Sequence, residues 1–141
     1  MNILVDVNVF EDVFRQRQGW EASLTVINCV RNKQTTGHVS ALTPPILYFF
    51  RRRTRGEKAA RQVVQRILQG FTVVPLTGEA IEKAYAASLP DFEDVLQLEA
   101  AKAAKVDALI TRNKKHFRQK EALGKHLIAC FTGTMKYSIV H

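Results

Sequence analysis

Two groups of acidic side chains, far apart in the sequence, could together form one chemical site. Asp6 follows directly after the apolar run Ile3–Val5, and the second group is Asp91-Phe-Glu-Asp94. In open α/β sheets ligands bind outside the carboxyl ends of strands, which is where Asp6 is expected. Asp91 and Asp94 are spaced so that both project from one side of a first helical turn. If Asp6 and Asp94 converge, they repel each other unless they share a proton or a cation.

The chemistry that such converging acids favour is metal-assisted cleavage of a phosphodiester. Oxygen ligands with few nitrogen or sulfur partners suit Mg²⁺ or Mn²⁺. Such an ion activates a water molecule and neutralises the charge that develops on the phosphate. A structural alternative stays open, because Asp6 or Asn8 could simply cap the following helix. In the second group a lone Asp would be an ordinary cap, whereas three acids within four residues exceed that need.

The charge of the chain indicates an anionic partner. Its 21 Lys and Arg residues against 13 Asp and Glu give a formal net charge of +8. Much of the excess lies in two clusters: Arg51, Arg52, Arg53, Arg55, Lys58 and Arg61 in one, and Arg112, Lys114 and Lys115 in the other. Clusters of this density commonly bind phosphate backbones. The alternative is a solvated helix surface that keeps the protein soluble.

Several other kinds of site are not indicated by the sequence. It contains neither a glycine-rich dinucleotide motif nor a P-loop, and it has no G-x-S-x-G nucleophile motif. The four histidines lack the spacing of zinc enzymes, and Cys29 and Cys130 lie in apolar surroundings typical of reduced core residues. Neither a signal peptide nor an apolar run of membrane-spanning length is visible. We therefore expect one cytoplasmic domain over residues 1–141, without a membrane segment.

The apolar pattern predicts alternating strands and helices. Runs of strand length are Ile3–Asp6, His38–Leu42, Phe71–Pro75, Ala108–Thr111 and Leu127–Phe131. Helical patterns cover Trp20–Val30, the residues after Thr43-Pro44, Glu57–Leu68, Thr77–Ala87, and a segment from Pro90-Asp91 to about Lys105. Gly70 is expected to end the third of these helices as a C′ glycine. Strands separated by helices predict an α/β fold, a three-layer α/β/α sandwich with a central parallel β-sheet.

Four segments in this order resemble the PIN domain, the fold of the VapC-type toxins in bacterial toxin–antitoxin pairs. They are Ile3-Leu-Val-Asp-Val-Asn-Val-Phe-Glu-Asp12, Val39-Ser-Ala-Leu-Thr43, Asp91-Phe-Glu-Asp-Val-Leu-Gln97 and Leu109-Ile-Thr-Arg-Asn-Lys-Lys-His-Phe117. The resemblance implies a parallel-sheet α/β/α sandwich with a Mg²⁺- or Mn²⁺-dependent ribonuclease site. It also implies RNA as the substrate, frequent homodimerisation, and a co-expressed antitoxin that neutralises the protein.

Carried over to this sequence, the resemblance implies a set of site residues. Asp6 and Asp94 match the metal-binding aspartates of the family and are the expected catalytic pair. Asp91 is a further candidate metal ligand, and Glu93 and Asp12 are candidates for the residues around the ligands. The positions expected to support the site are Asn8, Thr111, Asn113 and His116.

One departure from the family pattern weakens the expected site. Where the family commonly places a Glu on the helix after the second strand, this chain has Ile46, and no acid lies in Pro44–Phe50. Fewer carboxylates mean weaker affinity for a hard cation. Two functions therefore remain. One is an active metal-dependent endoribonuclease, the toxin of a toxin–antitoxin pair. The other is a catalytically weakened PIN-fold protein that binds RNA or a protein partner without cleavage.

In either case the basic clusters are expected to flank the acidic site and hold the RNA backbone, because a negative site does not attract a polyanion unaided. The residues assigned to this task are Arg51, Arg52, Arg53, Arg55, Arg112 and Lys114.

Overall fold

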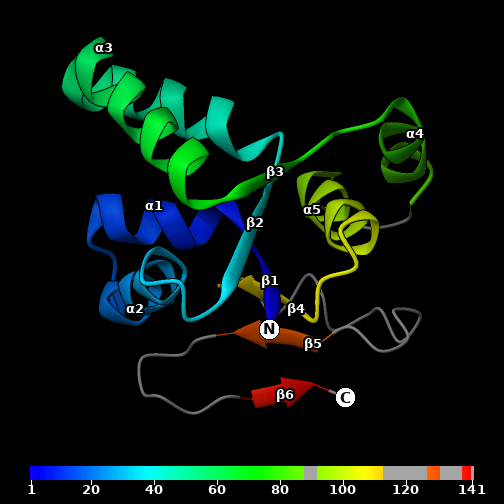
Figure 1. Cartoon of the computed structure of the whole chain (residues 1–141). Coiled ribbons are helices and arrows are strands. Elements are labelled where there is room, and N and C mark those ends of the chain that lie inside the picture. The colour runs from blue at the N-terminus through cyan, green and yellow to red at the C-terminus, as the bar shows by residue number, and fades with distance from the viewer. Residues whose placement is uncertain (88–91, 113–126, 131–137, 141) are drawn as a thin grey trace.

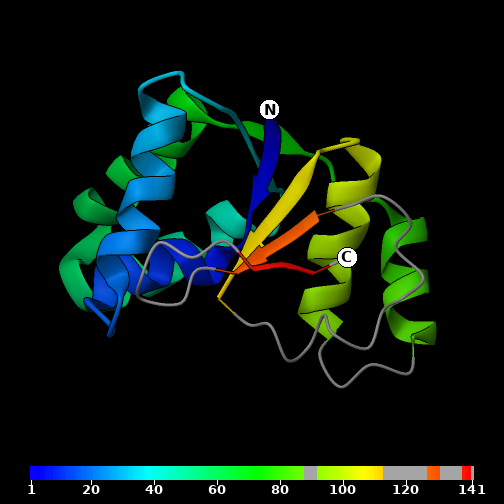
Figure 2. The same ribbon diagram turned by 90° about the horizontal axis from the view of Figure 1, so that it is seen from below.

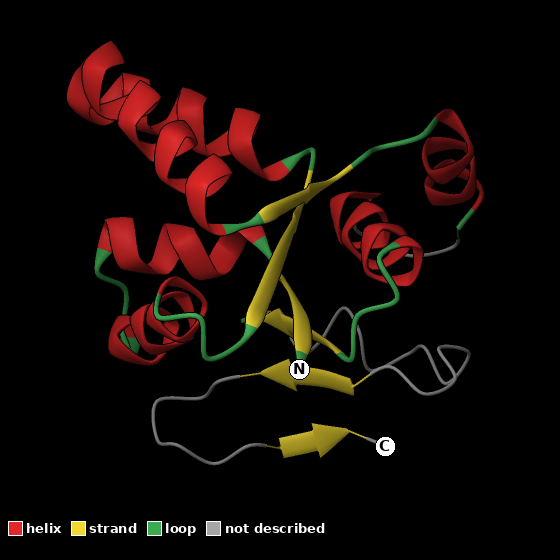
Figure 3. Cartoon of the chain, viewed as in Figure 1, coloured by secondary structure: helices red, strands yellow, loops and turns green. Residues whose placement is uncertain are grey.

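A six-stranded sheet forms the centre of the molecule. The computed structural model describes residues 1–87 and 92–112, together with the strands over residues 127–130 and 138–140. The strands are β1 (Asn2–Val5), β2 (Thr36–Ser40), β3 (Thr72–Val74), β4 (Ala108–Thr111), β5 (Leu127–Cys130) and β6 (Ser138–Val140). They lie in the order β3-β2-β1-β4-β5-β6 (Figure 1, Figure 3). Strands β1 to β5 are parallel, and β6 pairs antiparallel with β5 at the edge.

Helices cover both faces of this sheet (Figure 2). The helices are α1 (Val7–Arg15), α2 (Trp20–Arg31), α3 (Thr43–Gly70), α4 (Gly78–Ala86) and α5 (Phe92–Ala103). Side chains along β1 alternate between two cores: Ile3 and Val5 pack with α1, α2 and α3, and Leu4 packs with α5. Helix α4 packs against the outside of α5 through Ala84. The predicted three-layer α/β/α sandwich is confirmed, with one antiparallel edge strand added to the parallel sheet.

The predicted strands lie within one or two residues of the observed ones, because each is a compact apolar run. Strand β6 was not predicted, since three residues are too few for a periodic pattern to stand out. The helix expected to open at Pro90-Asp91 is α5, which the structure describes from Phe92 onward; the two opening residues lie outside the described part.

Helix α3 contains both helices that were expected between β2 and β3. They join at Gly56, whose φ of 84° and ψ of 174° are not helical, so the helix is sharply kinked there. Glycine populates positive φ at little cost, which explains why the kink falls on this residue. The two arms pack side by side (Figure 1), and the Tyr48 hydroxyl donates to Glu57 Oε1 across the kink at 3.4 Å.

Gly70 was expected to be a left-handed C′ glycine, and that expectation is wrong. Gly70 is the last residue of α3, and the chain turns directly into extended conformation at Phe71 (φ −127°, ψ 148°). Phe71 is buried and its ring meets the Phe10 ring edge-on, with centroids 5.4 Å apart. Burying this aromatic side chain contributes more than a capping turn would, and it leads the chain straight into β3.

None of the helices in the described residues combines the length and the apolar character needed to cross a membrane.

Candidate active site

Asp6 lies at the carboxyl end of β1, in the middle of the sheet. When the pairing of β1 with its two neighbours is extended past the end of the strand, Asp6 lies beside Ser40 of β2 and Thr111 of β4. The Asp6 N–H donates to the Ile110 carbonyl at 2.9 Å, which fixes the backbone to the neighbouring strand. Its side chain is buried, with 1% of its surface exposed. Asp6 occupies the N-cap position of α1, but its carboxylate makes no capping hydrogen bond, so capping does not explain it.

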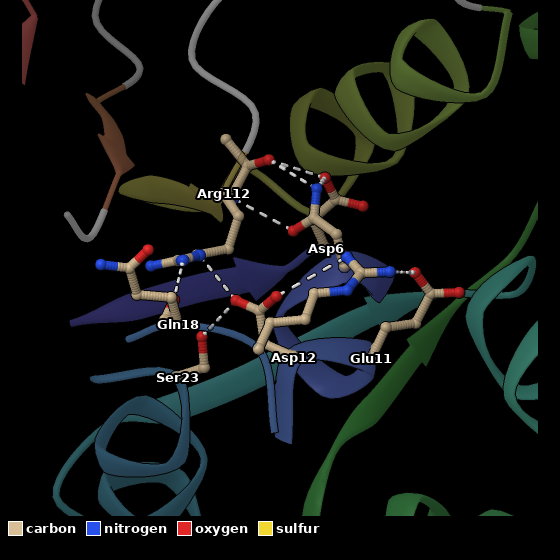
Figure 4. Close-up of polar contacts among 9 residues, drawn as sticks. Asp6, Glu11, Asp12, Gln18, Ser23 and Arg112 are labelled. Carbon is tan, nitrogen blue, oxygen red and sulfur yellow. Dashed lines mark hydrogen bonds and ion pairs between the residues drawn. The ribbon is translucent and has the colours of Figure 1, made fainter. Parts of the chain in front are cut away.

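Two neighbouring side chains hold the Asp6 carboxylate in place. The Thr111 hydroxyl donates to Oδ2 at 2.7 Å, and the Asn8 amide donates to the same oxygen at 2.8 Å. Asn8 is held in turn, because its Oδ1 accepts from the Arg112 backbone N–H at 3.0 Å. Figure 4 shows this network around Asp6 and Arg112. Asn8 and Thr111, both predicted from the sequence as supporting residues, therefore orient Asp6.

The electrostatic state of Asp6 is strongly perturbed. Burial raises its pKa to about 7 from the ordinary 3.8; the Thr111 hydrogen bond opposes this rise, and the charges of Asp94 and Glu93 add to it. Both of these acids lie in the first turn of α5, and Asp94 is buried. Asp94 and Glu93 of α5 therefore act on Asp6 at the end of β1. A buried carboxyl under this repulsion is stabilised by a proton or by a cation.

The donor set suits a hard divalent cation, although it is small. Among the residues that the structure describes, no group of three or more His, Cys, Asp or Glu is placed to hold a metal. Asp6 and Asp94 supply carboxylate oxygens, and Mg²⁺ is commonly held by one or two carboxylates while it keeps several waters. Four predicted residues, Asp91, Asn113, Lys114 and His116, lie outside the described residues and remain predictions. Two buried acids, one of which raises the pKa of the other, thus fit such an ion.

The sequence matches the PIN domain family over residues 2–115. This chain belongs to the PIN domain family. A toxin–antitoxin complex from Klebsiella pneumoniae has a similar structure, with a TM-score of 0.62 and 19% identity over 94% of this chain and 98% of that one. VapBC2 from Rickettsia felis, solved bound to a DNA fragment from their promoter, gives a TM-score of 0.61 at 12% identity, covering 94% and 100% of the two chains.

VapBC-1 from nontypeable Haemophilus influenzae gives a TM-score of 0.58 at 16% identity over 84% of this chain and 92% of that one. At these identities the likeness shows the fold. No curated protein matches the sequence at a significant level.

In this PIN domain the basic residue Arg112 has a structural task that the sequence did not reveal. Its guanidinium Nε lies 2.6 Å from Asp12 Oδ2, and its NH2 donates to the Gln18 carbonyl at 2.7 Å (Figure 4). Asp12 is buried and also accepts from the Ser23 hydroxyl at 3.0 Å. RNA binding by Arg112 stays a prediction, but its side chain already ties the end of β4 to α1 and to the loop before α2. The only hint in the sequence was an acid inside an otherwise apolar helix face, which needs a cation when buried.

The arginine run on α3 divides into one packed residue and three exposed ones. The Arg51 guanidinium carbon lies 4.7 Å from the centre of the Phe14 ring, a cation–π contact that joins α3 to α1. Arg52, Arg53 and Arg55 are exposed. The solvent-facing members of the run are therefore the better candidates for contact with RNA.

Three buried polar residues beside the acids were missed from the sequence. Ser40, Thr43 and Gln97 are buried, and Ile46 lies one helical turn after Thr43, half-buried against the core. A signal existed for Gln97, because it stands three residues after Asp94 and so shares its helix face.

Proposed function

We propose that this PIN domain is a Mg²⁺- or Mn²⁺-dependent endoribonuclease and the toxin of a toxin–antitoxin pair. The observation that carries the proposal is the buried Asp6 at the end of the central strand, its pKa raised to about 7 by burial and by the charges of Asp94 and Glu93. A purely structural carboxylate in such a position would be expected to pair with a cationic side chain. Within the described part of the chain, Asp6 instead meets the neutral donors Thr111 and Asn8 and the charges of further acids, which is the environment of a group that binds a cation.

Within this proposal, Asp6 and Asp94 hold the metal ion, and Asp91 is a third candidate ligand. The ion, when bound, lowers the pKa of a coordinated water and neutralises charge on the scissile phosphate. Thr111 and Asn8 contribute by fixing the Asp6 carboxylate through Oδ2, at 2.7 and 2.8 Å. Asn113 and His116 are proposed to support the site from the segment after β4.

The RNA backbone is proposed to be held by cationic side chains around the site. Arg52, Arg53 and Arg55 are exposed on α3 and suit this task without giving up an interaction inside the protein. Phosphate contacts position a strand without reading its sequence. Arg51, Arg112 and Lys114 stay in the proposed set. For Arg51 and Arg112 an internal role has now been described, so their share of RNA binding is expected to be smaller.

The proposed biological setting is a cytoplasmic toxin neutralised by an antitoxin, with homodimerisation as a further proposal. Support comes from the fold: the similar structures from Klebsiella pneumoniae, Rickettsia felis and Haemophilus influenzae were solved as toxin–antitoxin or VapBC assemblies. The formal charge of +8 fits both RNA and an acidic segment of a protein partner.

A second function is favoured by one specific observation. Ile46, where the family commonly carries a Glu, packs its side chain against the hydrophobic core. A PIN-fold protein without this acid could bind RNA or a protein partner without cleaving it. Weak metal binding would separate this function from the first, because cleavage depends on the ion and backbone binding does not.

The test is RNA cleavage by the purified full chain, alongside thermal unfolding with and without Mn²⁺. We expect cleavage that a chelator abolishes, and a melting temperature that rises with Mn²⁺, since a ligand that binds only the folded state stabilises it. Asp6→Asn keeps the size of the side chain and removes its charge, so both responses should vanish. Equal melting shifts in the wild type and in Asp6→Asn would contradict the metal site, and RNA binding without cleavage would favour the second function.

A further inference from the structure

The amide of Gln97 is an unexplained polar group beside the acidic site. Its side chain is fully buried, and its Oε1 has no hydrogen-bond partner within the part of the chain that the structure describes. A buried acceptor left unpaired carries its full desolvation penalty. Groups of this kind in folded proteins call for an explanation, such as an ordered water or an ion.

The position of Gln97 on α5 and its contact with Thr43 place it near both parts of the acidic site. On α5 it follows Asp94 by one helical turn, so both side chains project from one face of the helix. Its Nε2 donates to Thr43 Oγ1 at 3.5 Å, and Thr43 Oγ1 lies 3.5 Å from Ser40 Oγ. Ser40 ends β2 at the level of Asp6 on the neighbouring strand. The amide is therefore held beside the carboxyl end of the sheet, with its nitrogen side committed to Thr43.

The same region is where the family's usual Glu is missing. Ile46 lies one turn after Thr43 on α3, so the helix that would have carried the acid is the helix that Gln97 contacts. Amide carbonyl oxygens are ordinary ligands of hard cations, and they add an oxygen without adding charge. Such a ligand suits a site where Asp94 and Glu93 already act repulsively on Asp6.

We propose that Gln97 Oε1 is an oxygen ligand of the cation site and takes the place left by Ile46. This inference rests on the proposed metal-dependent function. It adds a neutral ligand to the pair Asp6 and Asp94. In the metal-free protein this carbonyl oxygen is buried and has no hydrogen bond to any of the described residues, which is unfavourable. Binding of the ion relieves that penalty, so part of the affinity comes from a group that is unfavourable without it.

Two variants of Gln97 give opposite signatures in calorimetric titration of the full chain with Mn²⁺. Gln97→Leu is close in size and removes both the unpaired oxygen and the long hydrogen bond from Nε2 to Thr43, two changes with opposite effects on stability, so the melting temperature of the metal-free protein should change little. Its Mn²⁺ affinity should fall by about tenfold, the lower end of losses seen around metal sites. Gln97→Glu adds a third carboxylate, so it should lower the metal-free melting temperature and tighten Mn²⁺ binding. Gln65→Leu, the same replacement on the exposed surface of α3, should leave the affinity unchanged.

The outcomes separate this inference from the proposed function. Wild-type binding that Asp6→Asn abolishes, and that Gln97→Leu weakens while Gln65→Leu does not, supports the ligand role. Wild-type affinity in Gln97→Leu overturns the inference alone and leaves the Asp6 site standing. Absence of Mn²⁺ binding in the wild type overturns both. If Gln97→Leu does not fold, Gln97→Met and Gln97→Glu answer the same question, because neither shortens the side chain.

Discussion

Arg112 and the buried Asp12 form an ion pair in which Nε and Oδ2 are 2.6 Å apart, with 22% of the Arg112 side chain exposed. The backbone of the same arginine donates to Asn8, and Asn8 donates to Asp6. One residue thus connects the carboxyl end of β4, helix α1 and the proposed metal ligand. An arginine that the charge pattern assigned to RNA is in this structure an internal support of the site.

Breaking this pair should lower the stability of the fold. Arg112→Ala leaves the buried Asp12 carboxylate with Ser23 and a more distant arginine, so we expect a loss of about 2–3 kcal/mol in the free energy of unfolding, measured with urea, below the full cost of breaking a buried pair because Arg112 is partly exposed. Arg17→Ala is the matched control. Arg17 also faces Asp12, but at 3.7 Å and with 43% of its side chain exposed. Its loss should stay below about 1 kcal/mol. Equal losses of stability in the two variants would show that the short Arg112–Asp12 pair stabilises the fold no more than the longer Arg17–Asp12 pair.

The sequence was sufficient for the parts of the fold and site that depend on local pattern. Strand runs and amphipathic helices bury their own apolar faces, so their order predicted the sandwich. Asp6 could be placed because ligands bind outside the carboxyl ends of strands in open α/β sheets, and Asn8 and Thr111 were assigned through the resemblance to the PIN domain. These residues do lie together, joined by hydrogen bonds of 2.7 to 3.1 Å.

What the sequence did not predict depends on pairs of distant residues. Asp12 and Arg112 are 100 positions apart, and no local pattern links an acid in one helix to a base after a later strand. The arginine run looked uniform in sequence, yet Arg51 packs on Phe14 while its neighbours face solvent. Gly70 followed a sound capping rule that the burial of Phe71 overrides. In each case tertiary packing decides between alternatives that local chemistry leaves equal.

The metal-free protein should lose stability as the pH rises toward neutrality. The pKa of Asp6 is about 7 in the folded protein, against an ordinary 3.8. The unfolded chain releases this proton at a lower pH than the folded protein does. The contribution of Asp6 to the free energy of unfolding therefore falls between about pH 4 and pH 7 and is constant above that. Asp6→Asn removes this titration. The free energy of unfolding of the variant, relative to that of the wild type, should therefore increase across that pH range and then stay constant.

The measurement is urea unfolding of both proteins in the presence of a chelator at several pH values. Glu82→Gln, which removes one exposed acid from α4, controls for the change in net charge. A difference between Asp6→Asn and the wild type that does not vary with pH would contradict the perturbed pKa of Asp6.

Placing a Glu at position 46 should lower the stability of the metal-free protein and raise its affinity for the metal ion. Ile46 is half-buried against the core, so Ile46→Glu removes apolar packing and brings a third negative charge near Asp6 and Asp94. We expect the metal-free protein to lose about 1–3 kcal/mol. Mn²⁺ should then raise the melting temperature more than it does in the wild type, because ligand charge strengthens binding of a hard cation. Ile46→Gln is the neutral control, and an identical Mn²⁺ response in the Glu and Gln variants would mean that position 46 does not reach the site.

The exposed arginines of α3 should contribute to RNA affinity through charge alone. Arg52, Arg53 and Arg55 face solvent, and each of them that binds a phosphate releases counterions from a single-stranded RNA. Replacing the three by Gln should weaken binding about equally for unrelated RNAs. It should also flatten the dependence of log affinity on log salt concentration by about 0.7 for each phosphate that is no longer neutralised.

A variant with the same change in net charge at the opposite edge of the sheet separates local phosphate binding from overall charge. Arg31, Lys33 and Lys105 are exposed near the amino ends of β2 and β4, away from Asp6. Replacing these three by Gln removes the same three charges, so a general electrostatic effect would lower the salt slope equally in both variants. We expect the slope, measured by binding isotherms at several salt concentrations, to fall only when the α3 arginines are replaced. An unchanged slope in that variant would mean that Arg52, Arg53 and Arg55 do not bind RNA phosphates. They would then be a solvated helix surface or a contact for a protein partner.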